Sequence, residues 1–262
     1  MMDAMNRIIL LSLGILLQSA GLAWSAPWVP PPGTSFEWIL QNYTGTIPAA
    51  KAVDIDLFDT PKAQVTALKA NGKKVICYVS VGSWENWRPD KNAFPASVKG
   101  KPLDGWPGER WLDIRNISVL GPILAARLDL CKSKGFAAVE PDNLDGFQAD
   151  TGFPLKRADA VRFIRWFAAQ AHQRDLSVGL KNVPELVPDL LGSMDWALTE
   201  DCFDQGWCAS LKPFITAGKA VFTVEYTDTG INFAAFCTKA KQLNLSPLLK
   251  RRALTPWSKR CP

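Results

Sequence analysis

Eight short apolar runs recur along the chain, and they constrain the fold more than any other feature of the sequence. They are Phe36–Leu40, Ala52–Asp56, Val75–Ser80, Phe136–Glu140, Ser177–Lys181, Trp196–Glu200, Ala220–Tyr226 and Ser246–Lys250. Each run is short and partly β-branched or aromatic, and most end in polar or charged residues. This pattern is typical of strands that are buried on both faces of a parallel sheet.

Stretches with helical spacing of their apolar residues stand between these runs. They include Ala63–Ala70, Val119–Lys132, Arg157–Arg174, Trp207–Ala217 and Phe233–Leu243. Gly72, Gly135 and Gly218 each stand just before a predicted strand, where the end of a helix needs a left-handed residue. Alternating strands and helices imply a parallel sheet with right-handed crossovers.

About eight such units close a barrel, so we predict an α/β fold consisting of a single (β/α)8 TIM barrel. An open, doubly wound sheet is the alternative architecture. Such a sheet normally shows a Gly-rich phosphate-binding turn after its first strand, and this sequence has none there. The barrel is therefore the preferred interpretation.

Residues 1–25 have the features of a signal peptide. Arg7 supplies the positive charge, the run Ile8–Leu17 is apolar, and Ala23 and Ser25 are small residues at the cleavage positions. The apolar run is shorter than the ~20 residues that span a bilayer, so we expect cleavage and no stable membrane insertion. Residues 26–262 would then form the barrel domain, which we expect to be monomeric and extracellular or periplasmic.

The six cysteines fit an oxidising destination, in which we expect them to form disulfides. A Cys202–Cys208 bridge would close a short loop, and a Cys237–Cys261 bridge would hold the tail. Cys77 and Cys131 either bridge or remain buried thiols, and spacing alone does not decide the pairing. A zinc site is not predicted, because the sequence has no CxxC pair. The basic residues near the C-terminus are interpreted as a solvated surface and not as a nucleic-acid site.

Acidic side chains collect at the C-terminal ends of the predicted strands, where the active site of a TIM barrel lies. The rim residues are Asp54, Asp56, Asp59, Tyr78, Ser80, Gly82, Glu140, Asp142, Asn143, Asp145, Lys181, Asn182, Glu200, Asp201, Glu225, Tyr226 and Asp228. Carboxylates that converge on one mouth repel each other, so they must be offset by cations or by a cationic ligand.

The single histidine limits the kinds of catalytic site that the sequence can form. His172 lies in a predicted helix, away from the strand ends, so Ser-His-Asp, Cys-His and multi-His zinc chemistry are excluded. Carboxylates remain for acid–base work, and two carboxylates flanking a bond are the arrangement that cleaves a glycosidic link. A carboxylate cluster that holds Mg²⁺ or Ca²⁺ is the alternative. The eleven tryptophans favour a sugar-binding groove, since sugar rings stack on indole, although a generous core would also use them.

An ordered set of segments carries a family resemblance. The segments are residues 53–59 (VDIDLFD), 74–82 (KVICYVSVG), 85–90 (ENWRPD), 111–115 (WLDIR), 135–136 (GF), 139–147 (VEPDNLDGF), 179–182 (GLKN), 200–202 (EDC) and 224–226 (VEY). In these the sequence resembles glycoside hydrolase family 114, the endo-α-1,4-polygalactosaminidases. The resemblance implies a (β/α)8 barrel and a catalytic pair formed by Asp142 and Glu200. It also implies a substrate of partly N-acetylated α-1,4-linked galactosamine, a cationic glycan that an acidic cleft would attract.

We predict a retaining hydrolysis with Asp142 as nucleophile and Glu200 as general acid/base, without a cofactor or metal. For the substrate amines, or for orienting the pair, we predict Asp56, Glu140 and Glu225. The other predicted substrate-binding residues are Asn182 for a hydroxyl, Tyr78 and Trp84 for stacking, and Asn143, Lys181 and Tyr226. A hydrolase of another amino-sugar or α-linked glycan is one alternative function. A secreted barrel that binds glycan without cutting it is the other.

Overall fold

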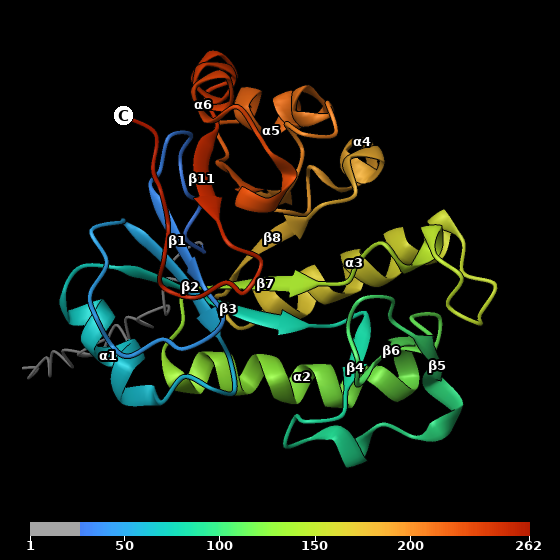
Figure 1. Cartoon of the computed structure of the whole chain (residues 1–262). Coiled ribbons are helices and arrows are strands. Elements are labelled where there is room, and N and C mark those ends of the chain that lie inside the picture. Colours follow the sequence, from blue (N-terminus) through green and yellow to red (C-terminus); the bar gives the residue numbers. More distant parts are fainter. Residues whose placement is uncertain (1–26) are drawn as a thin grey trace, which may run out of the picture.

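The computed structural model describes residues 27–262, in which eight parallel strands curl into a nearly closed barrel (Figure 1). The barrel strands are β1 (Phe36–Ile39), β2 (Ala52–Asp56), β3 (Lys74–Ser80), β7 (Ala138–Asp142), β8 (Ser177–Lys181), β9 (Trp196–Glu200), β10 (Val221–Tyr226) and β11 (Ser246–Lys250). Their order in the sheet follows their order in the chain, as a (β/α)8 barrel requires. The predicted fold class is confirmed, whereas the predicted signal peptide lies outside the described residues.

Seven of the eight predicted strands agree with the structure to within one residue at each end, and β7 is shifted. It begins at Ala138 rather than Phe136, because the Phe136 N–H still bonds to the Cys131 carbonyl in the last turn of the preceding helix (3.2 Å). It ends at Asp142 because Pro141 and Asp142 still pair with β3. Asp142 is therefore the last residue of a strand, a position set by the barrel itself.

The helices lie around the outside of the barrel (Figure 1). They are α1 (Lys62–Ala70), α2 (Ile117–Lys134), α3 (Arg157–His172), α4 (Val187–Leu190), α5 (Lys212–Thr216) and α6 (Phe233–Gln242). Gly72, Gly135 and Gly218 have φ angles of +71°, +97° and +72°, so the predicted left-handed residues before strands are confirmed. In residues 27–262 no helix has the length and apolarity to cross a membrane.

The interior of the barrel changes character along its axis. At the N-terminal ends of the strands it is filled by aromatic rings, with Phe222 stacked 4.5 Å from Phe36 and 5.4 Å from Trp196. Each such ring, when fully buried, contributes about 1.5–3 kcal/mol to folding. Toward the C-terminal ends the inward positions become charged, as at Asp54 on β2 and Lys181 on β8, and both are buried. The aromatic rings at the N-terminal end of the barrel thus lie beneath a layer of charged side chains.

A small antiparallel sheet, which was not predicted, interrupts the chain between β3 and α2. It consists of β4 (Ser83–Glu85), β5 (Lys99–Pro102) and β6 (Glu109–Leu112), with β6 in the middle. The sheet adjoins the C-terminal ends of β3 and β7, because Gly82 N–H bonds to the Asp142 carbonyl (3.2 Å) and Gly82 also accepts a bond from Leu112. A Cβ at Gly82 would lie 1.7 Å from the Asn143 carbonyl oxygen, so only glycine fits there.

Three disulfides cross-link the barrel domain. Cys77–Cys131 joins β3 to α2, Cys202–Cys208 closes the loop after β9, and Cys237–Cys261 ties the C-terminal tail to α6. The two expected bridges are confirmed, and the open question about Cys77 and Cys131 is answered by a third. Three bridges in one domain are typical of proteins that fold in an oxidising compartment.

Candidate active site

Asp142 and Glu200 meet at the C-terminal mouth of the barrel, around one buried ammonium group. Asp142 ends β7, Glu200 ends β9, and Lys181 ends β8, the strand between them. The Nζ atom of Lys181 lies 3.0 Å from Asp142 Oδ1 and 3.2 Å from Glu200 Oε2. Because both oxygens contact the same nitrogen atom, the distance between them cannot exceed the sum of these two distances.

A tyrosine holds the second oxygen of each carboxylate. Tyr78 donates its hydroxyl hydrogen to Asp142 Oδ2 (3.0 Å), and Tyr226 donates to Glu200 Oε1. Burial, and then the neighbouring carboxylate, raises the pKa of each tyrosine above its usual value. Both hydroxyls therefore stay protonated and remain hydrogen-bond donors at neutral pH.

Left-handed residues follow all three of these strand ends. Asn143, Asn182 and Asp201 have φ angles of +62°, +50° and +54°, a conformation that Asn and Asp adopt more readily than most residues. The turn lets the Asn143 N–H reach Asp142 Oδ1 (2.8 Å). It also places the Asn182 side chain against Glu200, whose backbone N–H it accepts (2.9 Å). Backbone strain of this kind is common at functional sites.

Lys181 is buried and surrounded by acids. Burial alone would lower its pKa, but the carboxylates of Asp142, Glu140 and Glu200 hold that pKa well above its usual value. Its ammonium also lies 4.7 Å from the centre of the Trp38 ring. Lys181 was predicted to bind substrate, and the structure instead places it beneath the pair, with its hydrogen bonds directed at carboxylates. We name the group formed by Glu140, Asp142, Lys181 and Glu200 the lysine cluster.

Three predicted substrate-binding carboxylates are not available to a substrate, because each is buried and bonded within the chain. Glu140 is fully buried and accepts hydrogen bonds from Trp38 Nε1 (2.9 Å) and Lys181 (3.0 Å). Asp56 is 4% exposed, and both of its oxygens accept hydrogen bonds from the guanidinium group of Arg88 (2.9 and 2.7 Å). We therefore do not retain these carboxylates, or Glu225, as contacts for substrate amines.

Glu225 supports the loop that follows β9. It is fully buried and accepts the backbone N–H groups of Phe203 (2.7 Å) and Asp204 (3.2 Å). Burial raises its pKa to about 7, although these two bonds oppose the shift. The sulfurs of Cys202 and Cys208 lie close to its carboxylate, but they are joined in a disulfide and cannot bind a metal.

The predicted stacking residue Trp84 lies on the small sheet. Its Nε1 donates to the Lys91 carbonyl (2.9 Å), and the Lys99 ammonium lies 4.4 Å from its ring centre. One face of the indole is thus already covered by a cation from the same sheet. Among residues 27–262, no hydrogen bond or cation–π contact joins Trp84 to the lysine cluster.

Asp145 was noted at the rim but was not selected as a site residue. It follows β7 by three residues, and its half-buried carboxylate has no ion pair or side-chain hydrogen bond with any residue from 27 to 262. Burial, and next the charge of Asp142, raises its pKa. A carboxylate beside other carboxylates, without a cation of its own, is suited to receive a positively charged group.

A second charged group, the arginine cluster, lies near the junction of the barrel and the small sheet. It is formed by Asp56, Glu85, Arg88, Asp90 and Arg127. Arg88 also bonds to Glu85 (2.7 Å), and Arg127 bonds to Asp90 (2.7 and 2.9 Å). Both guanidinium groups lie near the Phe58 ring, at 5.2 Å from its centre.

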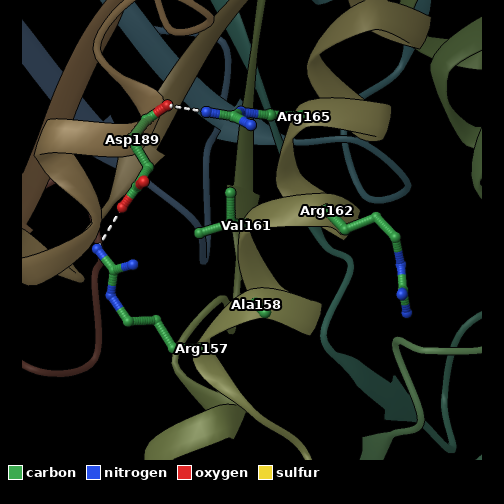
Figure 2. Close-up of a pocket in the computed structure, with 6 residues that line it drawn as sticks. All are labelled: Arg157, Ala158, Val161, Arg162, Arg165 and Asp189. Atoms are coloured by element: carbon green, nitrogen blue, oxygen red, sulfur yellow. Dashed lines mark hydrogen bonds and ion pairs between the residues drawn. The ribbon is translucent and has the colours of Figure 1, made fainter.

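The groove in Figure 2 lies on the outside of the barrel, and it is basic. Arg157 and Arg165 of α3 both bond to Asp189 of α4, the first to its carboxylate and the second to its carbonyl (2.7 Å). Arg162 pairs with Asp159 on its own helix (3.0 Å). These contacts brace two helices against each other, and none of the lining residues belongs to the mouth of the barrel.

A TIM barrel whose mouth holds two adjacent, partly exposed carboxylates has the architecture of a glycoside hydrolase. The family model of glycoside-hydrolase family GH114 matches residues 18–262, and the chain belongs to this family. The protein is therefore a glycoside hydrolase, and the family predicted from the sequence is confirmed.

Known structures and sequences agree with this assignment. The crystal structure of Aspergillus fumigatus Ega3 in complex with galactosamine is 38% identical, with a TM-score of 0.84, over 90% of this chain and 98% of that chain. The glycoside hydrolase domain of PelA from Pseudomonas aeruginosa shares the fold at 18% identity, with a TM-score of 0.70, over 88% of this chain and 99% of that chain. A protein from Deinococcus radiodurans is 27% identical over 229 residues, which are 77% of this chain and 73% of the relative.

Proposed function

We propose that the protein hydrolyses internal α-1,4-glycosidic bonds of galactosamine polysaccharides. The observation that carries this proposal is the convergence of Asp142 and Glu200 on the single ammonium of Lys181 at the barrel mouth. The similarity to Ega3, whose structure holds galactosamine, supports the choice of sugar.

We infer a retaining mechanism. Retaining enzymes have carboxyl groups about 5 Å apart, whereas inverting enzymes need about 6.5–9.5 Å to admit a water molecule. Because Asp142 Oδ1 and Glu200 Oε2 both contact Lys181 Nζ, at 3.0 and 3.2 Å, the two carboxylates lie close together, which favours the shorter, retaining separation. In the first step Asp142 attacks the anomeric carbon while Glu200 protonates the departing glycosidic oxygen. In the second, Glu200 takes a proton from water, which displaces Asp142 and restores both groups.

The two side chains differ in a way that supports this division of roles. The Glu200 side chain is 27% exposed and that of Asp142 is 19% exposed. The acid/base must exchange a proton with solvent water in the second step, which suits the more exposed group. Asp142 is held by Tyr78, Lys181 and the Asn143 N–H, which fixes a nucleophile in one orientation.

Asp145 is our candidate for binding the 2-ammonium group of the sugar. Its carboxylate lies near Asp142 and forms no direct ion pair with residues 27–262, and the charge of Lys181 offsets its raised pKa only in part, so a substrate ammonium would supply a cation in direct contact. An N-acetylated sugar has no such charge and would gain less from this contact. Asp145 would thus favour deacetylated positions of the polymer.

We also propose that the protein is exported. The predicted signal peptide and the three disulfides both support an oxidising destination outside the cytoplasm. Mass measurement of the N-terminus of the protein recovered from culture medium would test this proposal. A chain that keeps residues 1–25 and stays in the cell would contradict it.

Release of reducing ends from galactosamine polymer, with chitosan as a comparison, tests the function. We expect cleavage of the first polymer, and a loss of about a thousandfold or more in Asp142→Asn and in Glu200→Gln. Asp150→Asn is the matched control, because this exposed carboxylate (78%) lies outside the mouth. Binding of the polymer without cleavage by the wild type would support the glycan-binding alternative and contradict the proposal.

A further inference from the structure

Asp54 is a buried carboxyl group that the proposed reaction does not use. It lies on β2 next to Trp38 of β1, and it points into the barrel with no exposed surface. Neither of its oxygens meets an N–H or O–H donor anywhere in residues 27–262. Trp38, which pairs with Asp54 across β1 and β2, donates its Nε1–H to Glu140 Oε2 (2.9 Å), and the carboxyl group of Glu140 is a hydrogen-bonding neighbour of Asp54.

Two carboxyl groups in contact inside a protein cannot both be ionised, so one of them holds a proton. Glu140 has two N–H donors, from Trp38 on Oε2 and from Lys181 on Oε1, and these favour its charged form. Asp54 has no such donor, and burial, followed by the charge of Glu140, raises its pKa well above the usual value. The charge of Lys181 opposes this rise in the pKa of Asp54, and the charge of Asp142 adds to it. The shared proton is therefore bound to Asp54.

The contacts between Glu140 and Lys181 indicate the role of the proton on Asp54. A lysine ammonium has three N–H donors, and Lys181 has three carboxylates around it, at 3.0, 3.0 and 3.2 Å. Two of these carboxylates are Asp142 and Glu200, and the third is Glu140 beneath them. Glu140 is therefore the fixed support that orients the ammonium toward the pair.

We propose that Asp54 is a positioning residue for the catalytic pair. As a neutral acid it donates a hydrogen bond to Glu140, and Glu140 in turn anchors the ammonium of Lys181. The inference rests on the proposed function, since it assigns the pair its catalytic role. Asp54 does not touch the substrate, and it acts through two intermediate side chains.

The neutral acid can be tested by replacing it with a neutral donor of the same shape. Asn at position 54 presents an N–H to Glu140, whereas Leu fills the space and presents nothing. We expect Asp54→Asn to keep kcat within about threefold, and Asp54→Leu to lower kcat roughly tenfold with little change in KM. The deficit of Asp54→Leu should grow as the pH falls, because Glu140 without its donor takes up a proton more readily.

Thr199→Val is the matched control for these variants. Thr199 is buried on β9 beside Glu200, and its hydroxyl has no hydrogen-bond partner among the described residues. The control should leave kcat and its pH profile unchanged. The proposal is overturned if Asp54→Asn loses as much activity as Asp54→Leu, or if both variants match the wild type at every pH.

A spectroscopic measurement separates this inference from the proposed function. In the full protein labelled with carboxyl-¹³C aspartate, we expect one signal to remain at its protonated position at neutral pH and to vanish in Asp54→Asn. If every aspartate titrates at acidic pH, the inference fails even when the polymer is cleaved. If the signal persists but the wild type cleaves no polymer, the proposed function fails and the buried acid remains. If Asp54→Leu does not fold, this measurement still decides whether Asp54 holds a proton at neutral pH.

Discussion

The lysine cluster and the arginine cluster both gather acids around cations, but the two kinds of cation cover their carboxylates differently. Arg88 presents a planar fork that occupies both oxygens of Asp56, and the Asp56 side chain is 5% exposed. Lys181 is a point charge shared among three carboxylates, and it takes one oxygen from each. Asp142 and Glu200 therefore remain partly open to a substrate.

We infer that the kind of cation helps to decide which acids of the rim stay open to a substrate. A guanidinium that satisfies a carboxylate on both oxygens converts it into a structural contact. An ammonium shared by several carboxylates balances their charge without covering them. The arginine cluster should therefore matter most for stability, and the lysine cluster most for activity.

Replacing Lys181 with Met should give the largest effect on activity. The pair would lose the charge that holds it together, so we expect kcat to fall by about a hundredfold or more. The folded fraction should be checked by circular dichroism, since one buried and two partly buried acids then lack this cation. Lys132→Met is the control, because its pair with Asp175 is exposed (46% on each side). Activity within about threefold of the wild type would contradict the role of Lys181.

Replacing Arg88 with Met should give the largest effect on stability. Asp56 and Glu85 would both lose the guanidinium that bonds to them in a buried site, so we expect the free energy of unfolding to fall by about 3–5 kcal/mol. Urea denaturation measures the change, and kcat per folded molecule should fall far less than in Lys181→Met. Arg162→Met is the control, because this side chain is 56% exposed. A stability within about 0.5 kcal/mol of the wild type would contradict the comparison.

Asp145→Asn should give an intermediate effect that depends on the substrate. We expect KM for deacetylated galactosamine polymer to rise about tenfold, because the ammonium loses a charged partner. KM for a highly N-acetylated polymer should change little. Initial rates on the two polymers measure the difference. An equal change on both polymers would mean that Asp145 does not recognise the amine.

Glu225→Gln should change the pH dependence of stability. The pKa of Glu225 is about 7 in the folded protein against 4.5 for a free side chain. Between these values the unfolded chain loses its proton while the folded protein keeps it, so this group makes stability fall as the pH rises. Glu225→Gln should reduce that fall by on the order of 2 kcal/mol. Urea denaturation at about pH 5 and pH 7 tests this, with exposed Glu185→Gln as the control, and an unchanged slope would contradict it.

The sequence predicts the barrel well because its strands are local, apolar and regularly spaced. The small sheet was missed because the region from Ser83 to Leu112 is short of apolar runs, and its pairing joins residues far apart, such as Ser83 and Trp111. Non-local pairing of short polar strands leaves no periodic signal. The sheet nonetheless supplies Glu85 and borders Arg88, both of which belong to the arginine cluster.

The site was predicted as a list of acids at strand ends, and that list was too long. Asp142 and Glu200 do lie together, because parallel strands bring their C-terminal ends to one mouth. Asp56 lies at a strand end as well, but Arg88 neutralises it from 32 positions farther along the chain. Which acid has such a partner depends on tertiary contacts, so strand-end position alone cannot separate a catalytic acid from a buried ion pair.

Trapping of the covalent intermediate tests the central claim most directly. In Glu200→Gln, an activated α-galactosaminyl fluoride needs no acid for the first step, whereas the second step still needs the missing base, so a glycosyl-enzyme should accumulate. Peptide mass mapping should then find the added galactosamine on Asp142. An adduct on another carboxylate, or no adduct while the fluoride is hydrolysed, would contradict the assignment of the pair.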